Sequence, residues 1–443
     1  MPGAQTSESM SPGLMKVAER ARRDSQAQFN SLAHLIDVSA LRRAYHAQKA
    51  KAAPGIDGVT KEQYGQDLEA NLEDLHTRLR TMRWRHQPLL RQHIPKDDKP
   101  GQTRPIGISC LEDKIVQKAI TEVLTVVYEP VFRDCSYAYR PGRRPHDALR
   151  ALDRAAMQQE MQWVLEADIR SFFDQLDRKQ LMAFLRERVP DGSITRLVGK
   201  CLHVGVLDGE EFTMLEEGTA QGSCLSPLLG NLYLHYVLDA WFENEIKSLL
   251  QGSAKLLRFA DDFIIGFERR EDAERVMKVL GKRLAKYGLT LQPEKTRLVP
   301  FMRPSRSQTS GKGPGTFTFL GMTWYWCRSR KGNWVPRCRT RHDRLRRFVR
   351  RLHRWCKKHR HEPVADQHAG IVRRVSGHIN YYGVNGNGHC VRRVVSEARR
   401  MWRYWLNRRS QRSRFTWERY EDLLKSFPLP RPTVKVSIWG QVP

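Results

Sequence analysis

The stretch 256-LLRFADDFIIGF-267 places two adjacent aspartates, Asp261 and Asp262, between two apolar runs. Such runs around a short polar break predict two buried strands joined by a tight turn. Neighbouring side chains within a strand point to opposite faces, but at a tight turn both carboxylates can approach one site. An Asp-Asp turn exposed to solvent is the ordinary interpretation. The apolar flanks argue against it and favour a paired-carboxylate site at the end of a buried sheet.

A third carboxylate is found at Asp168, near the end of 163-WVLEADI-169, which predicts a short strand. Three carboxylates at one end of a sheet can hold two Mg²⁺ ions, which activate an attacking hydroxyl and stabilise a leaving oxygen. Mg²⁺ prefers oxygen ligands and usually shares its site with substrate phosphates. A two-metal nuclease would fit the same three acids.

Four further residues have the chemistry to contact a phosphorylated ligand. Lys96 and Arg104 lie in 94-IPKDDKPGQTRPIGI-108, which its Pro and Gly residues predict to be a basic loop. Gln221 lies in a glycine-flanked turn, where a backbone can approach a ligand closely, and Lys295 lies in 292-QPEKT-296. Each also has an ordinary interpretation as a solvated loop, a turn or a surface lysine.

The order of the predicted elements indicates an α+β fold. A helix is predicted to begin at Asp177, which can cap it, and other helices are expected over 111–128, within 218–242 and over 271–287. The segments 289–301 and 316–326 are expected to be strands. The apolar face of the helix 271–287 is predicted to consist of Ala273, Val276, Met277, Leu280 and Leu284.

The chain carries 77 Lys and Arg against 48 Asp and Glu among 443 residues, a formal net charge of +29. A fold does not need that excess, so nucleic acid is the first candidate partner and an anionic membrane surface the second. Twelve Lys or Arg and one acid lie between Arg337 and Arg360, where the apolar spacing predicts an amphipathic basic helix. A second such helix is predicted over Val391–Leu406, after a domain boundary near 330–340.

The composition also excludes several classes of protein. Hydrophobic residues make up 40% of the chain, enough for a sizeable core divided between two or three domains. No two of the eight cysteines lie closer than eleven residues, so a zinc site of the usual spacing is not expected. We find no apolar run long enough to span a membrane and no apolar core of a signal peptide in the first thirty residues. A cytoplasmic protein without a membrane partner is therefore expected.

Taken in order, the motifs resemble the blocks of a reverse transcriptase, and most closely those of the bacterial group II intron type. The blocks cover roughly residues 50–325 and read 94-IPK-96, 104-RPIGI-108, 136-SYAYRPGRRPHDAL-149, 163-WVLEADIRSFFD-174, 218-GTAQGSCLSPLLGNLYL-234, 258-RFADDF-263, 294-EKT-296 and 319-FLG-321. Single blocks are weak signals, whereas all of them in order are specific. The segments 375-VSGHINYYG-383 and 399-RRMWRYWLNRRSQ-411 resemble the maturase, or thumb, region of the same family.

The resemblance implies a right-hand polymerase: an N-terminal extension over 1–50, fingers and palm with an antiparallel sheet over 51–335, and a helical thumb or maturase domain over 336–435. It implies that the catalytic residues are Asp168, Asp261 and Asp262, and that these three and Ile169 bind two Mg²⁺ ions. It assigns Phe173 to a steric gate against the ribose 2′-OH, Lys96 and Arg104 to the triphosphate, Gln221 to the incoming nucleotide, and Lys295 to the vicinity of the palm site.

The implied function is that of an RNA-directed DNA polymerase that binds its intron RNA to assist splicing and copies that RNA during retrohoming. Its partners would be intron RNA, an RNA template with a DNA primer or target DNA, and dNTPs, in the cytoplasm and associated with the nucleoid. Two alternatives stay open: a group II-like enzyme recruited to host defence or DNA repair, and an RNA-binding splicing factor with an unused polymerase site.

The chain departs from the family pattern at two positions. Phe259 stands where the family often has Tyr, and Ala220 stands where Pro often precedes Gln-Gly; either change would affect fidelity or the nucleotide pocket. No Cys-pair, His-rich nuclease module follows the maturase-like region, so no C-terminal HNH endonuclease domain is expected.

Aromatic residues accompany the basic residues of the C-terminal region, and each could either stack on an unpaired base or belong to the core. Trp405 is predicted to lie in the core and Trp402 is left open. The other aromatic residues considered are Trp355, Tyr381 and Tyr382.

Overall fold

The protein is described here by a computed structural model, which covers residues 10–95, 101, 103–209, 211–214, 222–305, 313–409 and 415–439. The chain has an α+β fold. Its helices are α1 (Pro12–Arg23), α2 (Val38–His46), α3 (Lys61–Tyr64), α4 (Leu68–Arg80), α5 (Leu111–Tyr128), α6 (Pro145–Met157), α7 (Arg178–Arg188), α8 (Gly192–Leu202), α9 (Ser226–Leu234), α10 (Arg270–Lys286), α11 (His342–Lys358), α12 (Val364–Tyr382), α13 (Gly388–Leu406) and α14 (Trp417–Ser426). Its strands are β1 (Leu89–Pro95), β2 (Thr103–Ile108), β3 (Trp163–Asp168), β4 (Gly205–Asp208), β5 (Glu211–Met214), β6 (Ala254–Phe259), β7 (Asp262–Phe267), β8 (Arg297–Pro300), β9 (Phe317–Phe319), β10 (Met322–Arg328) and β11 (Trp334–Thr340).

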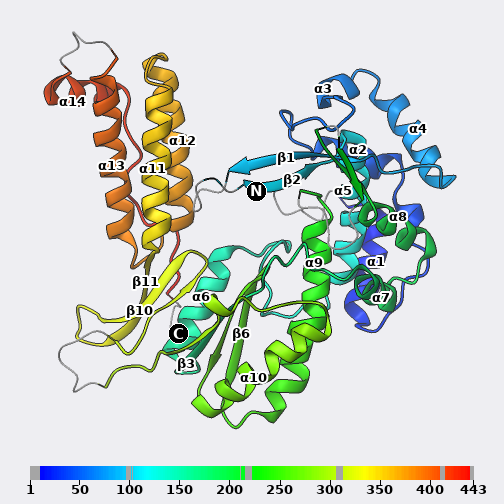
Figure 1. Cartoon of the computed structure of the whole chain (residues 1–443), viewed down its shortest axis with the longest axis horizontal. Helices are drawn as coiled ribbons and strands as arrows, with labels where there is room; N and C mark the ends of the chain where they lie inside the picture. The colour runs from blue at the N-terminus through cyan, green and yellow to red at the C-terminus, as the bar shows by residue number, and fades with distance from the viewer. Residues whose placement is uncertain are drawn as a thin grey trace.

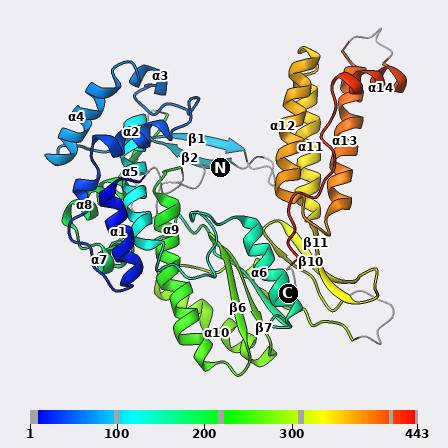
Figure 2. The same ribbon diagram turned by 180° about the vertical axis from the view of Figure 1, so that it is seen from behind.

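The N-terminal helices α1 and α2 pack against α5 (Figures 1 and 2). Leu14 and Leu41 are fully buried in the same core as Ile120 of α5. The described part of the predicted N-terminal extension is therefore folded onto the rest of the chain.

A hairpin replaces the loop that was predicted for 94–108. Strands β1 and β2 pair antiparallel, with Ile94 opposite Arg104, and they belong to a sheet of order β2–β1–β4–β5. The prediction was wrong because Pro105 argued against a strand. However, β2 is an edge strand, where the N–H that proline lacks is not required by a neighbour.

The central sheet has the strand order β6–β7–β3–β8, and all its pairs are antiparallel. Alternate residues face two different cores. Leu165, Phe263 and Ile265 face the core that α9 and α10 cover, whereas Val164 and Ile264 face a second core shared with β9 and β10. The predicted hairpin and the predicted strand before Asp168 are both confirmed, as is the Asp177 cap, which accepts the Gln180 backbone N–H at 3.0 Å.

Three sequence predictions differ from the structure in this region. The segment 289–301 is a strand only over Arg297–Pro300, because Pro293 begins a short 3₁₀ turn. The segment 316–326 is two strands, since Leu320 and Gly321 turn the chain with φ of +53° and +73°. Met277 is 37% exposed and does not belong to the buried face of α10.

The C-terminal helices α11, α12 and α13 lie side by side and share a third core, to which α14 adds Tyr420 (Figure 1). The two predicted basic helices are confirmed as α11 and α13. Trp405 is buried, as expected, and Trp402 is fully buried with its indole N–H donating to Gln367 Oε1 at 3.1 Å. In the described part of the chain, no helix is long and apolar enough to cross a membrane.

Candidate active site

The three predicted catalytic carboxylates lie at one end of the central sheet. Asp262 begins β7 and is paired directly with Asp168, the last residue of β3. Directly opposed residues of an antiparallel pair share a face, with Cβ atoms about 4.5–5.5 Å apart. Asp261 lies in the two-residue turn that joins β6 to β7. The side chain of Ile169 is buried, so among its atoms only the backbone carbonyl oxygen has the chemistry of a Mg²⁺ ligand.

The electrostatics of Asp262 favour a cation. Its burial raises the pKa of the carboxyl to about 7; a backbone hydrogen bond from Leu320 opposes the rise, and the charges of Asp261, Asp168 and Glu166 add to it. A carboxyl surrounded by other acids is stabilised in its charged form when a metal ion binds. The donor set therefore fits a divalent cation.

Within the described residues, no three His, Cys, Asp or Glu side chains are grouped closely enough to hold a metal ion by themselves. Mg²⁺ does not require such a group, because it retains several waters and is usually bound by one or two carboxylates together with substrate phosphates. The Asp168–Asp262 pair supplies that number of carboxylates.

Lys295 is brought to the acids from a distant part of the chain. Its amine forms an ion pair with Asp168 Oδ2, and the backbone N–H of Gln292 donates to the Asp168 carbonyl oxygen at 2.8 Å. The Lys295 side chain is 66% exposed. An exposed lysine can leave Asp168 at small cost, so the ion pair does not prevent the carboxylate from binding a metal.

The turn between β9 and β10 connects α12 with the acids. The backbone of Leu320 hydrogen-bonds Asp262, and its carbonyl oxygen accepts the hydroxyl of Tyr381 at 3.1 Å. The adjacent Tyr382 lies so close to Gly321 that a Cβ there would come within 2.9 Å of its hydroxyl oxygen. The sequence singled out 319-FLG-321 and both tyrosines, but it gave no sign that they meet.

The predicted steric gate, Phe173, is partly buried. Its ring lies 5.1 Å from that of Phe172 and packs against Gly230 of α9, where a Cβ would lie 3.1 Å from the ring. The ring is thus held in place by α9. Phe259, which replaces the more usual tyrosine, is partly buried against the second core.

The other predicted nucleotide contacts are placed only in part. Lys96, Ala220 and Gln221 lie outside the described residues, and of Arg104 the structure describes the backbone in β2 but not the side chain. Gly222 has φ +122°, and a Cβ there would collide with the carbonyl oxygen of Gly107 in β2. The segment that follows Gln221 is therefore packed on the strand that carries Arg104.

The part of the chain that contains these residues is similar to known proteins. Residues 94–324 match the family described as reverse transcriptase (RNA-dependent DNA polymerase). The chain is 30% identical to protein YkfC of Escherichia coli over 284 residues, which cover 56% of the chain and 74% of YkfC. It is 29% identical to the group II intron-encoded protein LtrA of Lactococcus lactis over 307 residues, 67% of the chain and 49% of LtrA. It also matches nuclear intron maturase 2 of Arabidopsis thaliana, 26% identical over 182 residues, or 32% of the chain and 24% of that protein.

Proposed function

Because the chain belongs to the reverse transcriptase (RNA-dependent DNA polymerase) family, we propose that it copies the RNA of a group II intron into DNA and binds that RNA to assist splicing. The observation that carries the proposal is the direct pairing of Asp168 with Asp262 at the end of a sheet, inside the region that matches the family. LtrA is named as a group II intron-encoded protein, and this chain covers about half of its length.

The metal site would be formed by Asp168, Asp261 and Asp262, with the carbonyl oxygen of Ile169 as a further oxygen ligand. Two Mg²⁺ ions bound there would lower the pKa of the primer 3′-hydroxyl and stabilise the leaving oxygen. The Leu320 backbone orients the Asp262 carboxylate by a hydrogen bond. Lys295 balances the charge of Asp168 before substrate arrives.

The nucleotide would be selected by residues around the sheet end. The Phe173 ring, fixed against α9, would clash with a ribose 2′-OH and so favour dNTPs over NTPs. Lys96 and Arg104, from the β1–β2 hairpin, would neutralise the triphosphate. Gln221, next to a glycine packed on β2, would contact the incoming nucleotide.

The nucleic acid would lie across a right-hand arrangement, with residues 51–335 as fingers and palm and 336–435 as thumb or maturase domain. The helices α11 and α13 supply exposed arginines, which attract the phosphates of a structured RNA. Tyr381 of α12 donates to the Leu320 carbonyl, and the Leu320 backbone hydrogen-bonds Asp262. Because α12 packs against α11 and α13, these contacts would couple RNA bound to the C-terminal helices to the catalytic end of the sheet.

Primer extension tests the proposal. With an RNA template, a DNA primer and Mg²⁺, we expect dNTPs to be incorporated and NTPs to be rejected. Binding of the RNA without any incorporation would instead support a splicing factor whose polymerase site is unused.

A further inference from the structure

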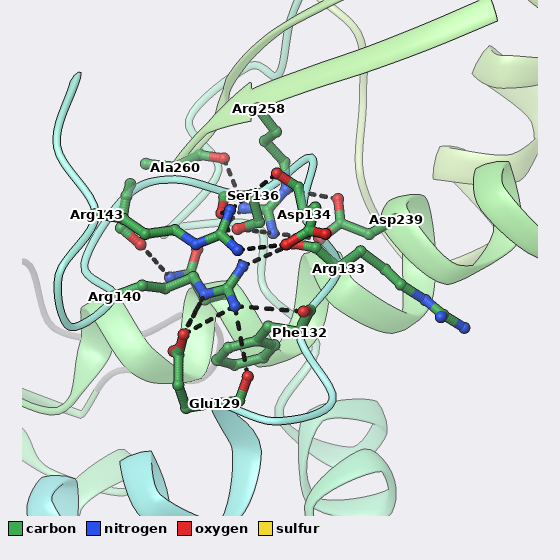
Figure 3. Close-up of polar contacts among 12 residues, drawn as sticks. Glu129, Phe132, Arg133, Asp134, Ser136, Arg140, Arg143, Asp239, Arg258 and Ala260 are labelled. Carbon is green, nitrogen blue, oxygen red and sulfur yellow. Dashed lines mark hydrogen bonds and ion pairs between the residues drawn. The ribbon is translucent and has the colours of Figure 1, made fainter. Parts of the chain in front are cut away.

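An arginine buried behind the metal-binding hairpin has every hydrogen-bond donor satisfied. Arg258, in β6, is 0% exposed. A guanidinium has five N–H donors. Here they reach five acceptors. Figure 3 labels the residues of four of them, which are Asp239 Oδ1 (2.7 Å), Asp239 Oδ2, Ser136 Oγ (2.8 Å) and the carbonyl oxygen of Ala260 (3.0 Å). The fifth acceptor is Asn231 Oδ1, at 3.0 Å.

These acceptors come from four different parts of the chain. Asn231 lies in α9, Asp239 in the π-helical segment that continues it, and Ser136 in the loop before α6. The backbone of Arg258 holds the same loop, since its N–H donates to Cys135 O at 2.8 Å and its carbonyl accepts the Tyr137 N–H at 3.0 Å. The guanidinium therefore joins the hairpin to a rigid support.

The contact with Ala260 lies in the turn that carries Asp261. Ala260 has φ +58°, a left-handed conformation that is unfavourable for a residue with a Cβ. An unfavourable backbone conformation persists only where its surroundings hold it. The hydrogen bond from Arg258 Nη1 to the Ala260 carbonyl supplies such a hold, one residue before Asp261 and two before Asp262.

The charge of Arg258 is balanced away from the metal site. Burial alone would lower the pKa of Arg258, but pairing with Asp239 outweighs burial and raises it. Asp239 is itself 0% exposed, so the two charges form a closed pair inside the protein. Arg258 therefore forms its bidentate ion pair with Asp239 and not with the carboxylates that would bind the metal, and it fixes the turn through the Ala260 carbonyl.

We infer that Arg258 is a positioning residue. It fixes the position and orientation of the Ala260–Asp261 turn, so that the carboxylates of Asp261 and Asp262 are placed to bind metal ions. The inference rests on the proposed polymerase function. It assigns to Asp239, Asn231 and Ser136 the role of anchoring the arginine, and to none of them a contact with substrate.

The test is Arg258→Lys in the full chain, compared with Arg140→Lys. Lysine keeps the charge but has a single nitrogen, so it cannot reach acceptors spread over four segments. Arg140 is a matched control, since it is a buried arginine whose hydrogen bonds go to Glu129 and to the backbone carbonyls of the same loop and not to the Ala260–Asp261 turn.

For Arg258→Lys we expect the kcat of single-nucleotide addition to fall about 100-fold, as for a misplacement of about 1 Å. The KM for dNTP and the affinity for primer–template should change less than about threefold, because neither is bound by this arginine. The Mg²⁺ concentration at half-maximal rate should rise. Arg140→Lys should lower the Tm while the folded enzyme keeps its kcat.

Two results would overturn the inference: an unchanged kcat in folded Arg258→Lys, or an equal loss of kcat in Arg140→Lys. Hydrogen–deuterium exchange of the segment 259–263 decides the matter independently of activity. It should accelerate in Arg258→Lys and stay unchanged in Arg140→Lys. If the wild type extends no primer, the proposed function fails, and this exchange still tests the positioning role.

A milder variant covers the case in which Arg258→Lys does not fold. Ser136→Ala removes one acceptor and leaves one guanidinium N–H unpaired. We expect kcat to fall roughly 2- to 10-fold, with local acceleration of exchange over 259–263. An unchanged kcat and unchanged exchange would contradict the role assigned to Arg258.

Discussion

His86 and Asp113 form a buried pair beside β1, with His86 Nδ1 lying 3.5 Å from Asp113 Oδ2. His86 Nδ1 donates to the Gln87 carbonyl at 2.6 Å, and its Nε2 accepts the Gln117 amide at 2.7 Å, which suits a neutral imidazole. Burial lowers the pKa of His86 to about 4 and raises the pKa of Asp113 to about 8. The folded pair therefore holds one proton between those two pH values.

We expect the free energy of unfolding to fall as the pH rises from about 6.5 to about 8, because the unfolded pair binds no proton there while the folded pair binds one. The decline should be about 1.4 kcal/mol per pH unit, about 2 kcal/mol in all. Below about pH 6.5 the unfolded histidine also holds one proton, so the pair adds no slope. Urea unfolding at both ends of this range measures the decline. Asp113→Asn has no titrating carboxyl there and should lose it; an equal decline in that variant would contradict the assignment.

Trp402 is a core residue and not a platform for stacking bases. It is fully buried, its indole N–H is bonded to Gln367, and its ring lies edge-on to Tyr420 at 5.9 Å. Replacing it by alanine should lower the free energy of unfolding by about 3–5 kcal/mol, the range for a buried tryptophan.

Trp417 provides the control for this variant. It is 46% exposed, with Arg403 over its ring at 4.1 Å. Trp417→Ala should cost about 1 kcal/mol. Equal losses for the two variants in thermal unfolding would mean that Trp402 does not anchor the third core.

At the scale of elements, the contact between β2 and the segment after Gln221 is sensitive to substitution. Gly222→Ala would place a Cβ against the Gly107 carbonyl oxygen at a positive φ, so the segment must move away from β2. We expect the KM for dNTP to rise about tenfold, since the neighbouring Gln221 would shift with it.

Gly209→Ala is the control that introduces backbone strain without a steric clash. Gly209 also has a positive φ, +63°, but no heavy atom lies within 4 Å of a Cβ built there. The Gly209→Ala enzyme should lose stability and keep the wild-type KM for dNTP. Steady-state kinetics on both variants makes the comparison, and an unchanged KM in Gly222→Ala would remove the nucleotide role of this segment.

The elements that carry the acids could be predicted from sequence because their apolar runs are local signals. Leu256–Phe267 and Trp163–Asp168 each show such a run, and a hairpin brings its own strands together. Helices α7, α10, α11 and α13 were predictable for the same reason, from caps and helical spacing. Helix α12 was not predicted, although part of it lies in the segment 375–383, which resembles the maturase region.

The parts that could not be predicted depend on contacts between distant segments. Lys295 meets Asp168, and Tyr381 meets Leu320, only after the chain has folded. Pairing of β1 with β2 overrode the signals of Pro105 and Gly107, which lie within β2. The sequence does contain one signal for such a contact. Arg258 is the only charged residue of the apolar run 256-LLRFA-260, and a charge buried in a strand needs a partner.

For the whole molecule, the net charge of +29 predicts strongly salt-dependent RNA binding. Helix α11 offers an exposed basic face that includes Arg346, Arg350 and Lys357. Replacing these three by glutamine should reduce the slope of log affinity against log salt by about 2–3, because each phosphate contact contributes about 0.7–0.9.

A triple variant on α10 has the same change of charge and is the matched control. Lys278, Lys282 and Lys286 are also exposed, but they lie on α10, which packs on the face of the central sheet that points away from β9 and β10 (Figure 2). Their replacement by glutamine should change the slope by less than about 1. Filter binding over a salt series compares the two triple variants. Equal slopes would show that α11 contributes no more to RNA binding than α10 does.

Nucleotidyl transfer by the paired carboxylates can be measured by single-turnover primer extension on an RNA template with Asp262→Asn. We expect a loss of at least about 10³-fold in rate with RNA affinity unchanged, because the proposed metal site loses a ligand and the basic helices are unaltered. Glu271→Gln, an exposed carboxylate of α10, should extend the primer at the wild-type rate. Extension by Asp262→Asn at the rate of the wild type would show that these carboxylates do not perform the transfer.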